Sequence, residues 1–528
     1  MSHTKTKNRK ARQTVWLQLT QEKIIVPALM LIATVVRFAT ITKASIWHDE
    51  GFTMMLIARN PAEIWAGSAR DVHPPLFYEL LHGWTQIFGR SELAARSMSA
   101  VAGLATIFIC YLLVKRYFSR QSATIVLLLL ALAPFLIRYS QEARMYGLLG
   151  LFTIGATYML LRYLEKRNNN RWLVAYAFLM AAGLFTHYFT ALVVVAHWLY
   201  VMSLETPWRW RFGKSFWLSW HWIITNIAIL ILWSPWLPSF YGQFSRGQGI
   251  SWIPRTTERT FTNSMWQNLT FTDGGQLPQL VYWLIPLMIF AGVSYLAWRL
   301  RNKVPQIKML YFYTFLPILL TIVVSVVKPV YQDRYLVFAA NGLVVLMGIA
   351  VYELIKRQRT IGYTVLGLLV AVCVVGAMNV ARQASHSMGK VGTYVDQKFQ
   401  VGDEIISAEL YTYFDFSYYC KQCLDVRNRQ TPLPEGFEDL AVALPSYVQL
   451  QLNTVGGRPN GYGESALLYD RSEKIYLDDW SQIHPGSGRV WLVGKPGDKP
   501  YWQETPVNWT ELDRYQTNSS EVRLYQVQ

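Results

Sequence analysis

The stretch LVFAANGLVVLMGIAVYEL, residues 336–354, is apolar over most of its length and is followed closely by Lys356, Arg357 and Arg359. An α-helix needs about 20 mostly apolar residues to cross the hydrocarbon core of a bilayer. Lys and Arg residues collect in the cytoplasmic loops that flank such helices. The stretch therefore predicts a transmembrane helix whose C-terminal end lies in the cytoplasm.

The same pattern of apolar blocks and short basic clusters repeats along the chain. Its 528 residues are 52% hydrophobic and only 16% charged, whereas soluble domains carry about 25% charged residues. This composition disfavours a water-soluble enzyme and excludes disorder, collagen and coiled coil. We expect an α-helical polytopic membrane protein with about eleven transmembrane helices, within a range of about ten to thirteen. The predicted spans are 24–42, 94–114, 122–138, 147–162, 172–186, 189–205, 217–237, 279–298, 309–327, 336–354 and 361–379.

Basic residues between the spans determine the predicted orientation. With the N-terminus inside, every cytoplasmic loop is basic, and a shift by one helix would put all of these clusters outside. Residues 1–23 then form a basic cytoplasmic N-terminus, 24–380 the membrane domain and 381–528 an extracytoplasmic domain. The first span could be a cleavable signal peptide, but it lacks a clear small-residue cleavage site, so we expect a retained helix. Topology explains the net charge of +17, and no nucleic-acid partner is expected.

Three outer regions are long enough to fold. Residues 43–93 carry apolar residues at helical spacing, which predicts amphipathic helices on the membrane face. Residues 238–278 are rich in Gly, Ser, Thr and Trp and are expected to form a loop that could close over a site. In the tail, expected strands at 404–408, 489–493 and 522–527 and a helix at 408–418 predict a small α/β domain. Cys420 and Cys423 form either a local disulfide or two free thiols, and a zinc site is not expected.

Polar residues interrupt the apolar sequence at five places, and the predicted topology puts all five on the outer side. If they were only helix ends, about half of them would fall inside. The five stretches are residues 47–51, 71–76, 138–147, 186–188 and 332–335. Their joint position predicts one site at the outer rim of the membrane.

The first two stretches provide carboxylates. Asp49, Glu50 and Asp71 could act as a base or as metal ligands. An Asp-Glu pair after a helix can also be a solvated helix end or a cap, and His73-Pro-Pro can be only a rigid turn.

The other stretches provide cations and aromatic rings. Arg144 and Arg334 could hold a phosphate, and His187 with several tyrosines could complete a polar wall. The two arginines could instead anchor helix ends at lipid head groups, and His187 could be a satisfied interfacial histidine. Arg37, inside the first span, receives no role. Carboxylates beside phosphate-binding arginines at a membrane surface suit a polyprenyl-phosphate sugar.

At these residues the chain resembles the GT-C superfamily of integral-membrane glycosyltransferases. Within it, the chain is similar to family 39, the branch with protein O-mannosyltransferases and lipid A aminoarabinose transferases. The resemblance covers about 40–380 and rests on Asp49-Glu50, on DVHPPL at 71–76 and on Arg334-Tyr335. Residues 140–146 and 186–188 are similar to bacterial members of the branch.

The resemblance implies the GT-C fold and an inverting transfer from a polyprenyl-phosphate-linked donor on the non-cytoplasmic side. It implies Asp49 as general base, with Glu50 positioning the acceptor or supporting Asp49. The residues implied to bind donor or substrate are Asp71, His73, Glu142, Arg144, Tyr146, His187, Tyr188, Arg334 and Tyr335. Within that set, the arginines and the adjacent tyrosines would neutralise the leaving phosphate.

The chain also departs from the family pattern. Protein O-mannosyltransferases follow Pro-Pro-Leu with Gly-Lys, whereas here Phe77-Tyr78 follows, and no outer loop is long enough for their β-trefoil insertion. A bacterial plasma membrane is therefore the expected location. The acceptor remains open between a glycan, a lipid and a protein. A divalent cation on Asp49, Asp71 and Glu142 also stays open, because relatives differ in metal use.

Two other classes of function fit less well. A transporter or flippase places its site near the bilayer midplane, often with inverted repeats, whereas here the ionisable residues lie at one rim. A scaffold would leave the Asp-Glu and His-Pro-Pro stretches without a purpose. We therefore expect a transferase.

Overall fold

The computed structural model describes residues 22–204, 216–246, 253–382, 387–407, 410–420, 447–450, 476–477, 483, 485–496 and 505–527. The chain divides into two compact units. Unit 1 comprises Met1–Thr40, Ser99–Pro235 and Ile253–Arg382, and unit 2 comprises Ile41–Met98, Trp236–Trp252 and Gln383–Gln528. The first outer segment thus belongs to the same unit as the C-terminal tail.

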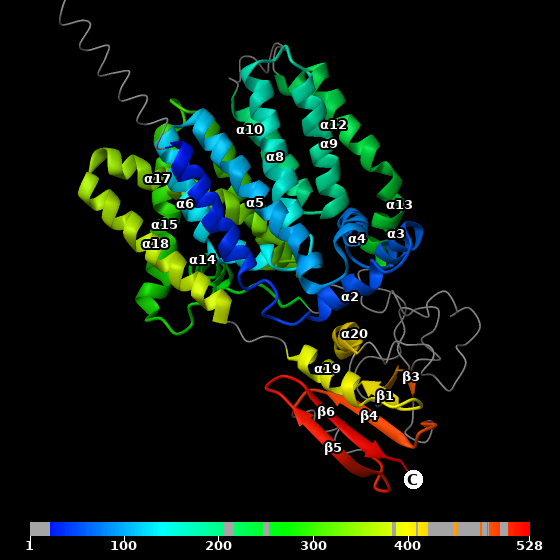
Figure 1. The fold of residues 1–528 in the computed structure, drawn as a ribbon. Coiled ribbons are helices and arrows are strands. Elements are labelled where there is room, and N and C mark those ends of the chain that lie inside the picture. Colours follow the sequence, from blue (N-terminus) through cyan, green and yellow to red (C-terminus); the bar gives the residue numbers. More distant parts are fainter. Residues whose placement is uncertain are drawn as a thin grey trace, which may run out of the picture. The chain divides into compact units, whose positions relative to one another are not determined.

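Unit 1 is built from long helices that run side by side (Figure 1). It begins with a helix over residues 22–38. The further elements are α5 (Glu92–Tyr117, shared with unit 2), α6 (Arg120–Leu132), α7 (Pro134–Ser140), α8 (Tyr146–Glu165), α9 (Arg171–Thr186), α10 (Thr190–Ser203), η1 (Phe216–Leu218), α12 (Trp220–Trp233), α14 (Thr260–Thr270), α15 (Gln279–Leu300), α16 (Gln306–Val327), η3 (Asp333–Leu336), α17 (Val337–Arg357) and α18 (Arg359–Arg382).

The stretch at 336–354 forms a buried helix of unit 1. Every residue from 335 to 349 is buried, and α17 packs against α6, α8, α16 and α18. By contrast, α18 exposes Ile361, Leu368 and Val375. A helix that is apolar all round lies in a core or in a membrane. The buried α17 is a core helix, and the exposed apolar residues of α18 are typical of a helix in a membrane.

All eleven predicted spans coincide with helices among the described residues. Seven helices are long and apolar enough to cross a membrane, and the bent pair α6–α7 would make eight. Of the other three predicted spans, two correspond to α9 and α10, which are shorter, and one to the helix whose described part covers residues 22–38. All eleven predicted spans are therefore helical in the described chain, and seven or eight of them have the length and composition of a full crossing.

The bend between α6 and α7 has a clear cause. The two helices meet at 59°, and Pro134 at the start of α7 has no N–H to offer the carbonyl of Leu130. Arg37 supplies the missing donors, with bonds of 3.2 Å to the carbonyls of both Leu130 and Ala131. Arg37 is fully buried, so it caps a broken helix instead of reaching the membrane surface.

The first outer segment of unit 2 is helical, as the apolar spacing predicted. It contains α2 (His48–Leu56), α3 (Pro61–Arg70) and α4 (Leu76–Phe88). A capping box between Asn60 and Glu63 starts α3, with a proline in the first turn. The Phe52 and Tyr78 rings lie 6.5 Å apart and join α2 to α4.

The predicted loop at 238–278 contains two helices, so its description as a loop was wrong in part. Its described residues include α13 (Leu237–Arg246) and α14. In α14 the side chains of Met265, Trp266 and Leu269 are buried. Burial of this apolar face outweighs the weak helix propensity of the surrounding Ser, Thr and Asn residues.

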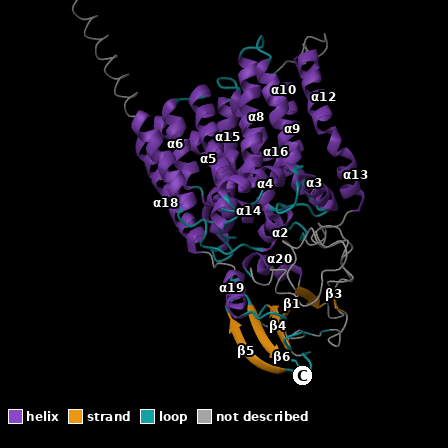
Figure 2. Cartoon of the chain, turned by 45° about the vertical axis from the view of Figure 1, so that its right-hand side comes forward, coloured by secondary structure: helices purple, strands orange, loops and turns teal. Residues whose placement is uncertain are grey.

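The tail of unit 2 forms the expected α/β domain (Figure 2). Its elements are α19 (Met388–Lys398), β1 (Glu404–Ser407), α20 (Leu410–Tyr419), β2 (Tyr447–Leu450), β3 (Tyr476–Leu477), β4 (Arg489–Gly494), β5 (Thr510–Gln516) and β6 (Glu521–Gln526). The sheet order is β3-β2-β1-β4-β6-β5. The first four strands are parallel, and β6 runs antiparallel to both β4 and β5.

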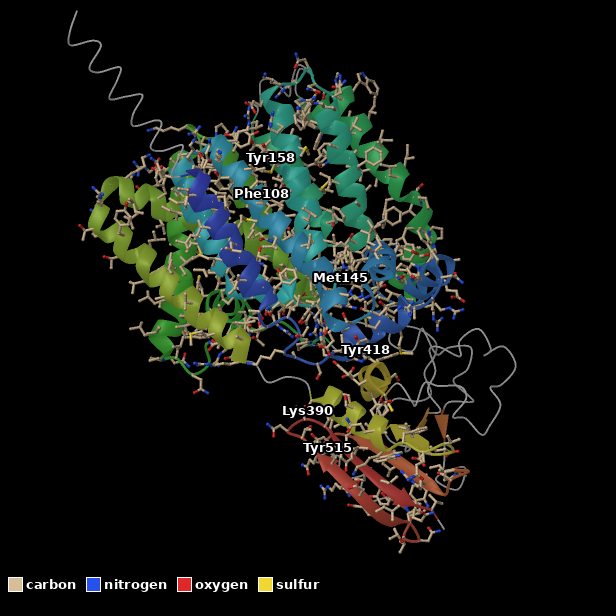
Figure 3. The ribbon with its side chains drawn as sticks, in the orientation of Figure 1. Phe108, Met145, Tyr158, Lys390, Tyr418 and Tyr515 are labelled. Carbon is tan, nitrogen blue, oxygen red and sulfur yellow. The ribbon has the colours of Figure 1, made fainter. Side chains whose placement is uncertain are left out.

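One face of this sheet carries an aromatic contact. The Tyr394 ring of α19 stacks on Tyr515 of β5 at 4.5 Å, and Figure 3 labels Tyr515 together with Lys390 of α19. Cys420 follows α20, but Cys423 lies outside the described residues, so their pairing stays a prediction.

Candidate functional site

Two predicted stretches meet at one end of unit 1. The His187 ring, between α9 and α10, lies 5.0 Å from the Tyr335 ring that precedes α17. The Phe189 ring lies 5.5 Å from the same tyrosine. His187 is buried, and its Nδ1 accepts a hydrogen bond from the Phe189 N–H, which fixes the ring. Tyr188 is half-buried, with its ring 6.4 Å from Trp233.

The segment between α7 and α8 adds a third stretch. The Arg138 guanidinium lies 2.8 Å from the Glu142 carboxylate, and the Tyr139 and Tyr146 rings meet edge to face at 5.3 Å. Tyr139 is also in electrostatic contact with Glu142, Tyr146 and Arg334. Glu142, Tyr146 and His187 therefore lie near Arg334 and Tyr335, at the start of α17.

Backbone contacts hold this segment in place. The Gln141 side chain donates to the Arg37 carbonyl at 2.9 Å, so the first helix holds both ends of α7. A Cβ at Gly147 would lie 2.6 Å from the Ser99 carbonyl, so glycine allows α8 to approach α5 there. The Ser99 hydroxyl in turn donates to the Arg144 carbonyl at 2.9 Å.

The cations of this group are largely shielded from solvent. Arg144 is buried and Arg334 is half-buried, with its guanidinium 5.8 Å from the centre of the Tyr335 ring. Tyr146 is fully buried. Because electrostatic interactions strengthen away from water, shielded guanidinium groups bind an anion more strongly than exposed ones.

The basic loops lie at the opposite end of unit 1. The 20 residues of α8 run about 30 Å from Tyr146 to Glu165. There the Arg116 guanidinium pairs with Glu165 at 2.5 Å, and Arg162 lies 4.6 Å from the Trp172 ring. The predicted phosphate-binding residues and the predicted cytoplasmic clusters are thus separated by about one bilayer thickness.

In unit 2, Glu50 is committed to a buried ion pair. It is fully buried, and the Arg96 Nε and Nη2 atoms donate to its two carboxylate oxygens at 2.8 and 2.5 Å. The same guanidinium also donates to the carbonyls of Ile41, Ala44 and Ser45 at 2.7, 2.7 and 3.1 Å. Glu50 and Arg96 therefore fix the chain that leads into α2.

Asp49 differs from its neighbour. It lies in the first turn of α2 and is half-buried. Its backbone carbonyl accepts a bond from the Thr53 hydroxyl at 2.8 Å, so the helix holds the residue. A negative side chain is favourable at a helix N-terminus. Asp49 thus keeps partial exposure to solvent, whereas Glu50 has none.

Asp71 and His73 form a pair of their own. Asp71 is the C-cap of α3, and His73 Nδ1 lies 3.2 Å from its carboxylate. Both residues are buried, and Pro74 and Pro75 lead from this turn into α4. A carboxylate on one ring nitrogen fixes the orientation of the imidazole.

The residues present do not fit a divalent-cation site. Across the described parts of both units, no three His, Cys, Asp or Glu side chains lie close enough to hold a metal ion. Of the three candidates, Asp71 contacts His73 and Glu142 contacts Arg138.

The sequence analysis gave no role to Arg37 in unit 1, or to Arg96 and Asp415 in unit 2. A charged residue inside a predicted span is costly and usually has a purpose, and both arginines carried that signal. Asp415 carried no such signal, because an aspartate in a folded domain is unremarkable.

Sequence comparisons point to one class of enzyme. Residues 72–238 match the family described as dolichyl-phosphate-mannose-protein mannosyltransferase. A stretch of 126 residues is 26% identical to the putative mannosyltransferase YkcB of Bacillus subtilis (strain 168). That match covers 24% of this chain and only 18% of the Bacillus protein.

Solved structures show the same fold at low identity. ArnT from Cupriavidus metallidurans in the apo state has a TM-score of 0.62 and 13% identity, covering 97% of this chain and 98% of that chain. The same enzyme bound to undecaprenyl phosphate gives 0.60 and 13%, covering 94% and 97%. An oligosaccharyltransferase from Archaeoglobus fulgidus gives 0.52 and 12%, covering 77% and 64%. The family match and the shared fold together confirm the resemblance to the GT-C superfamily of integral-membrane glycosyltransferases.

Proposed function

We propose that the chain transfers a sugar from a polyprenyl-phosphate-linked donor to a hydroxyl of an acceptor, with inversion at the sugar C1. The proposed location is the extracytoplasmic face of a bacterial plasma membrane, with a cytoplasmic N-terminus and an extracytoplasmic tail. The family match and the fold shared with an enzyme that binds undecaprenyl phosphate support this donor class. The basic loops support the orientation. The acceptor is a glycan, a lipid or a protein.

Asp49 is the proposed general base. Its carboxylate takes the proton of the acceptor hydroxyl while that oxygen attacks C1 from the face opposite the phosphate. The C1–oxygen bond to the phosphate breaks, and its electron pair leaves with the polyprenyl phosphate. The observation that carries this assignment is the contrast between the two adjacent carboxylates: Asp49 is half-buried, and Glu50 is fully buried against Arg96.

Glu50 is proposed as a positioning residue. Its ion pair with Arg96 holds the segment that leads into α2. The first turn of α2, which carries Asp49, is thereby kept in a fixed position. The family resemblance left two roles open for Glu50, which are to position the acceptor or to support Asp49. Because Arg96 already binds both carboxylate oxygens of Glu50, support of Asp49 is the role that fits.

Arg144 and Arg334 are proposed to neutralise the leaving phosphate, assisted by Tyr146 and Tyr335. Charge develops on the phosphate as the bond breaks, and fixed cations stabilise that transition state without reorganising. Their shielded setting at the start of α17 strengthens this interaction. His73, oriented by Asp71, is a further proposed phosphate contact.

The test uses Asp49→Asn, with Asp513→Asn as control, a substitution of the same kind at a half-buried strand residue that is paired with Lys398. Deleting the gene in its own organism, followed by mass spectrometry of envelope glycans and lipids, identifies the product that disappears. Loss of a general base costs about 10²–10⁴-fold in rate, so Asp49→Asn should restore almost none of that product. The purified variant should bind undecaprenyl phosphate as the unsubstituted chain does.

Two results would contradict the proposal at different levels. Near-normal product with Asp49→Asn would eliminate Asp49 as the base. A deletion strain that loses no glycoconjugate would contradict the transferase itself.

A further inference from the structure

Helix α20 of the tail packs directly on α2, the helix that carries Asp49 (Figures 1 and 2). The backbones approach so closely that a Cβ on Gly51 would lie 2.7 Å from the carbonyl carbon and oxygen of Phe414. Only glycine permits this approach without movement of one helix. The Phe414 ring also meets the His48 ring at 5.5 Å and the Phe52 ring at 5.6 Å.

Two tyrosines at the end of α20 hold it against the rest of the 41–98 segment. The Tyr419 hydroxyl accepts a bond from the Ile46 N–H at 2.6 Å and contacts the Glu92 carboxylate. The Tyr418 hydroxyl, labelled in Figure 3, donates to the Arg90 carbonyl at 2.8 Å. Contacts on both sides of α2 therefore fix the register of α20.

This packing brings the Asp415 side chain to the N-terminal turn of α2. Asp415 interacts electrostatically with His48, Asp49 and Glu50 on that helix, and with Lys495, which follows β4. Its Oδ1 atom is buried and has no hydrogen-bond partner within the described chain. Burial raises the pKa of Asp415 to about 8.

A buried carboxyl oxygen without a partner needs an explanation, because leaving such a group unsatisfied costs about 1–3 kcal/mol. Neither His48 nor Lys495 lies within hydrogen-bond distance of this oxygen, and the remaining groups of the cluster cannot donate to it. Asp49 and Glu50 are carboxylates, and Glu50 already uses both oxygens for Arg96. A hydroxyl donor that enters the site beside Asp49 would satisfy Asp415.

We propose that Asp415 is a specificity-determining residue of the acceptor side, which binds a hydroxyl group of the acceptor next to Asp49. This proposal rests on the proposed function, and it gives the tail a direct part in the reaction. Helix α20 carries one acceptor contact and holds that contact next to Asp49. The packing of Gly51 on Phe414 sets that register.

The test measures acceptor and donor separately in the full-length protein. Membranes of the deletion strain contain the unmodified acceptor and are titrated at fixed donor. Asp415→Asn keeps the shape of the side chain but changes its hydrogen-bonding pattern. Asp415→Ala removes the polar group altogether. Asp513→Asn, in the same domain and paired with Lys398, is the matched control.

We expect Asp415→Asn to raise the half-saturating amount of acceptor membranes at least tenfold and Asp415→Ala to raise it further. Maximal rate and undecaprenyl phosphate affinity should change less than threefold, and the unfolding midpoint should not fall. An unchanged acceptor requirement, or a fall in maximal rate alone, would overturn the role of Asp415. If the unsubstituted chain neither binds undecaprenyl phosphate nor modifies these membranes, the proposed function itself fails instead.

Discussion

In unit 1 the candidate phosphate-binding residues lie at the ends of long apolar helices, whereas in unit 2 the candidate base lies on a nine-residue helix. Unit 1 positions its residues by ring contacts, such as that between His187 and Tyr335. Unit 2 uses a buried ion pair that also binds three backbone carbonyls.

The difference indicates how each region should respond to substitution. Ring contacts are many and individually weak, about 0.5–1.5 kcal/mol each, so the loss of one leaves the rest in place. A buried ion pair depends on both partners, because removing one leaves an uncompensated buried charge. Unit 2 should therefore be the more sensitive region.

The largest expected effect comes from Arg96→Met. This change leaves the Glu50 carboxylate buried without its partner, at a cost of about 3–5 kcal/mol. Chemical unfolding followed by Trp fluorescence measures the loss. Lys356→Met, which breaks the exposed pair with Glu353, should cost less than about 1 kcal/mol. If the two variants are equally stable, the buried ion pair of unit 2 is not the sensitive contact that the comparison predicts.

Arg334→Ala tests the proposed phosphate-binding residues at the start of α17. Loss of a shielded charge-assisted contact should weaken undecaprenyl phosphate binding by about 2–5 kcal/mol, with little change in protein stability. Titration of the purified protein with this lipid measures the affinity. Arg359→Ala, at the start of α18, serves as control because Arg359 is exposed. The phosphate role fails if both variants bind the lipid alike.

Arg37→Met addresses the bend that presents the 138–147 segment. Without the guanidinium, the carbonyls of Leu130 and Ala131 lose their bonds from Arg37. The expected loss is about 1–3 kcal/mol of stability. Arg37→Lys keeps the charge and should lose less. If Arg37→Met is as stable as the unsubstituted chain, the bend between α6 and α7 does not depend on the hydrogen bonds from Arg37.

The last expected effect is a change at Asp415 in how stability depends on pH, and its size varies with pH and vanishes below about pH 4. Its pKa is about 8 in the folded chain, against about 3.9 when unfolded. Between these values the folded state keeps a proton that the unfolded state releases, so stability falls as pH rises from about 4 to 8 and then levels off. Asp415→Asn removes this contribution. Thermal unfolding of both proteins across that range should show their difference growing with pH, and parallel curves would contradict the buried carboxyl.

Much of the fold could be predicted because hydropathy and charge are local properties. The eleven helices, the helical first outer segment and strands such as β4 and β6 all lie where the sequence places them. The two short spans were predicted closely as well: 172–186 corresponds to α9 and 189–205 to α10. The helix α14 was missed because its residues favour turns and only burial of Trp266 and its neighbours makes it helical.

The sequence by itself determined which residues carry charge at helix ends and, through the repeat of apolar and basic blocks, the class of protein. It could not distinguish Asp49 from Glu50, since their difference depends on Arg96, 46 residues away. Nor could it bring α20 to α2 or Arg37 to the carbonyls of α6. Such pairings arise only when distant segments pack, because burial and hydrogen-bond geometry are properties of the folded chain and not of its local composition.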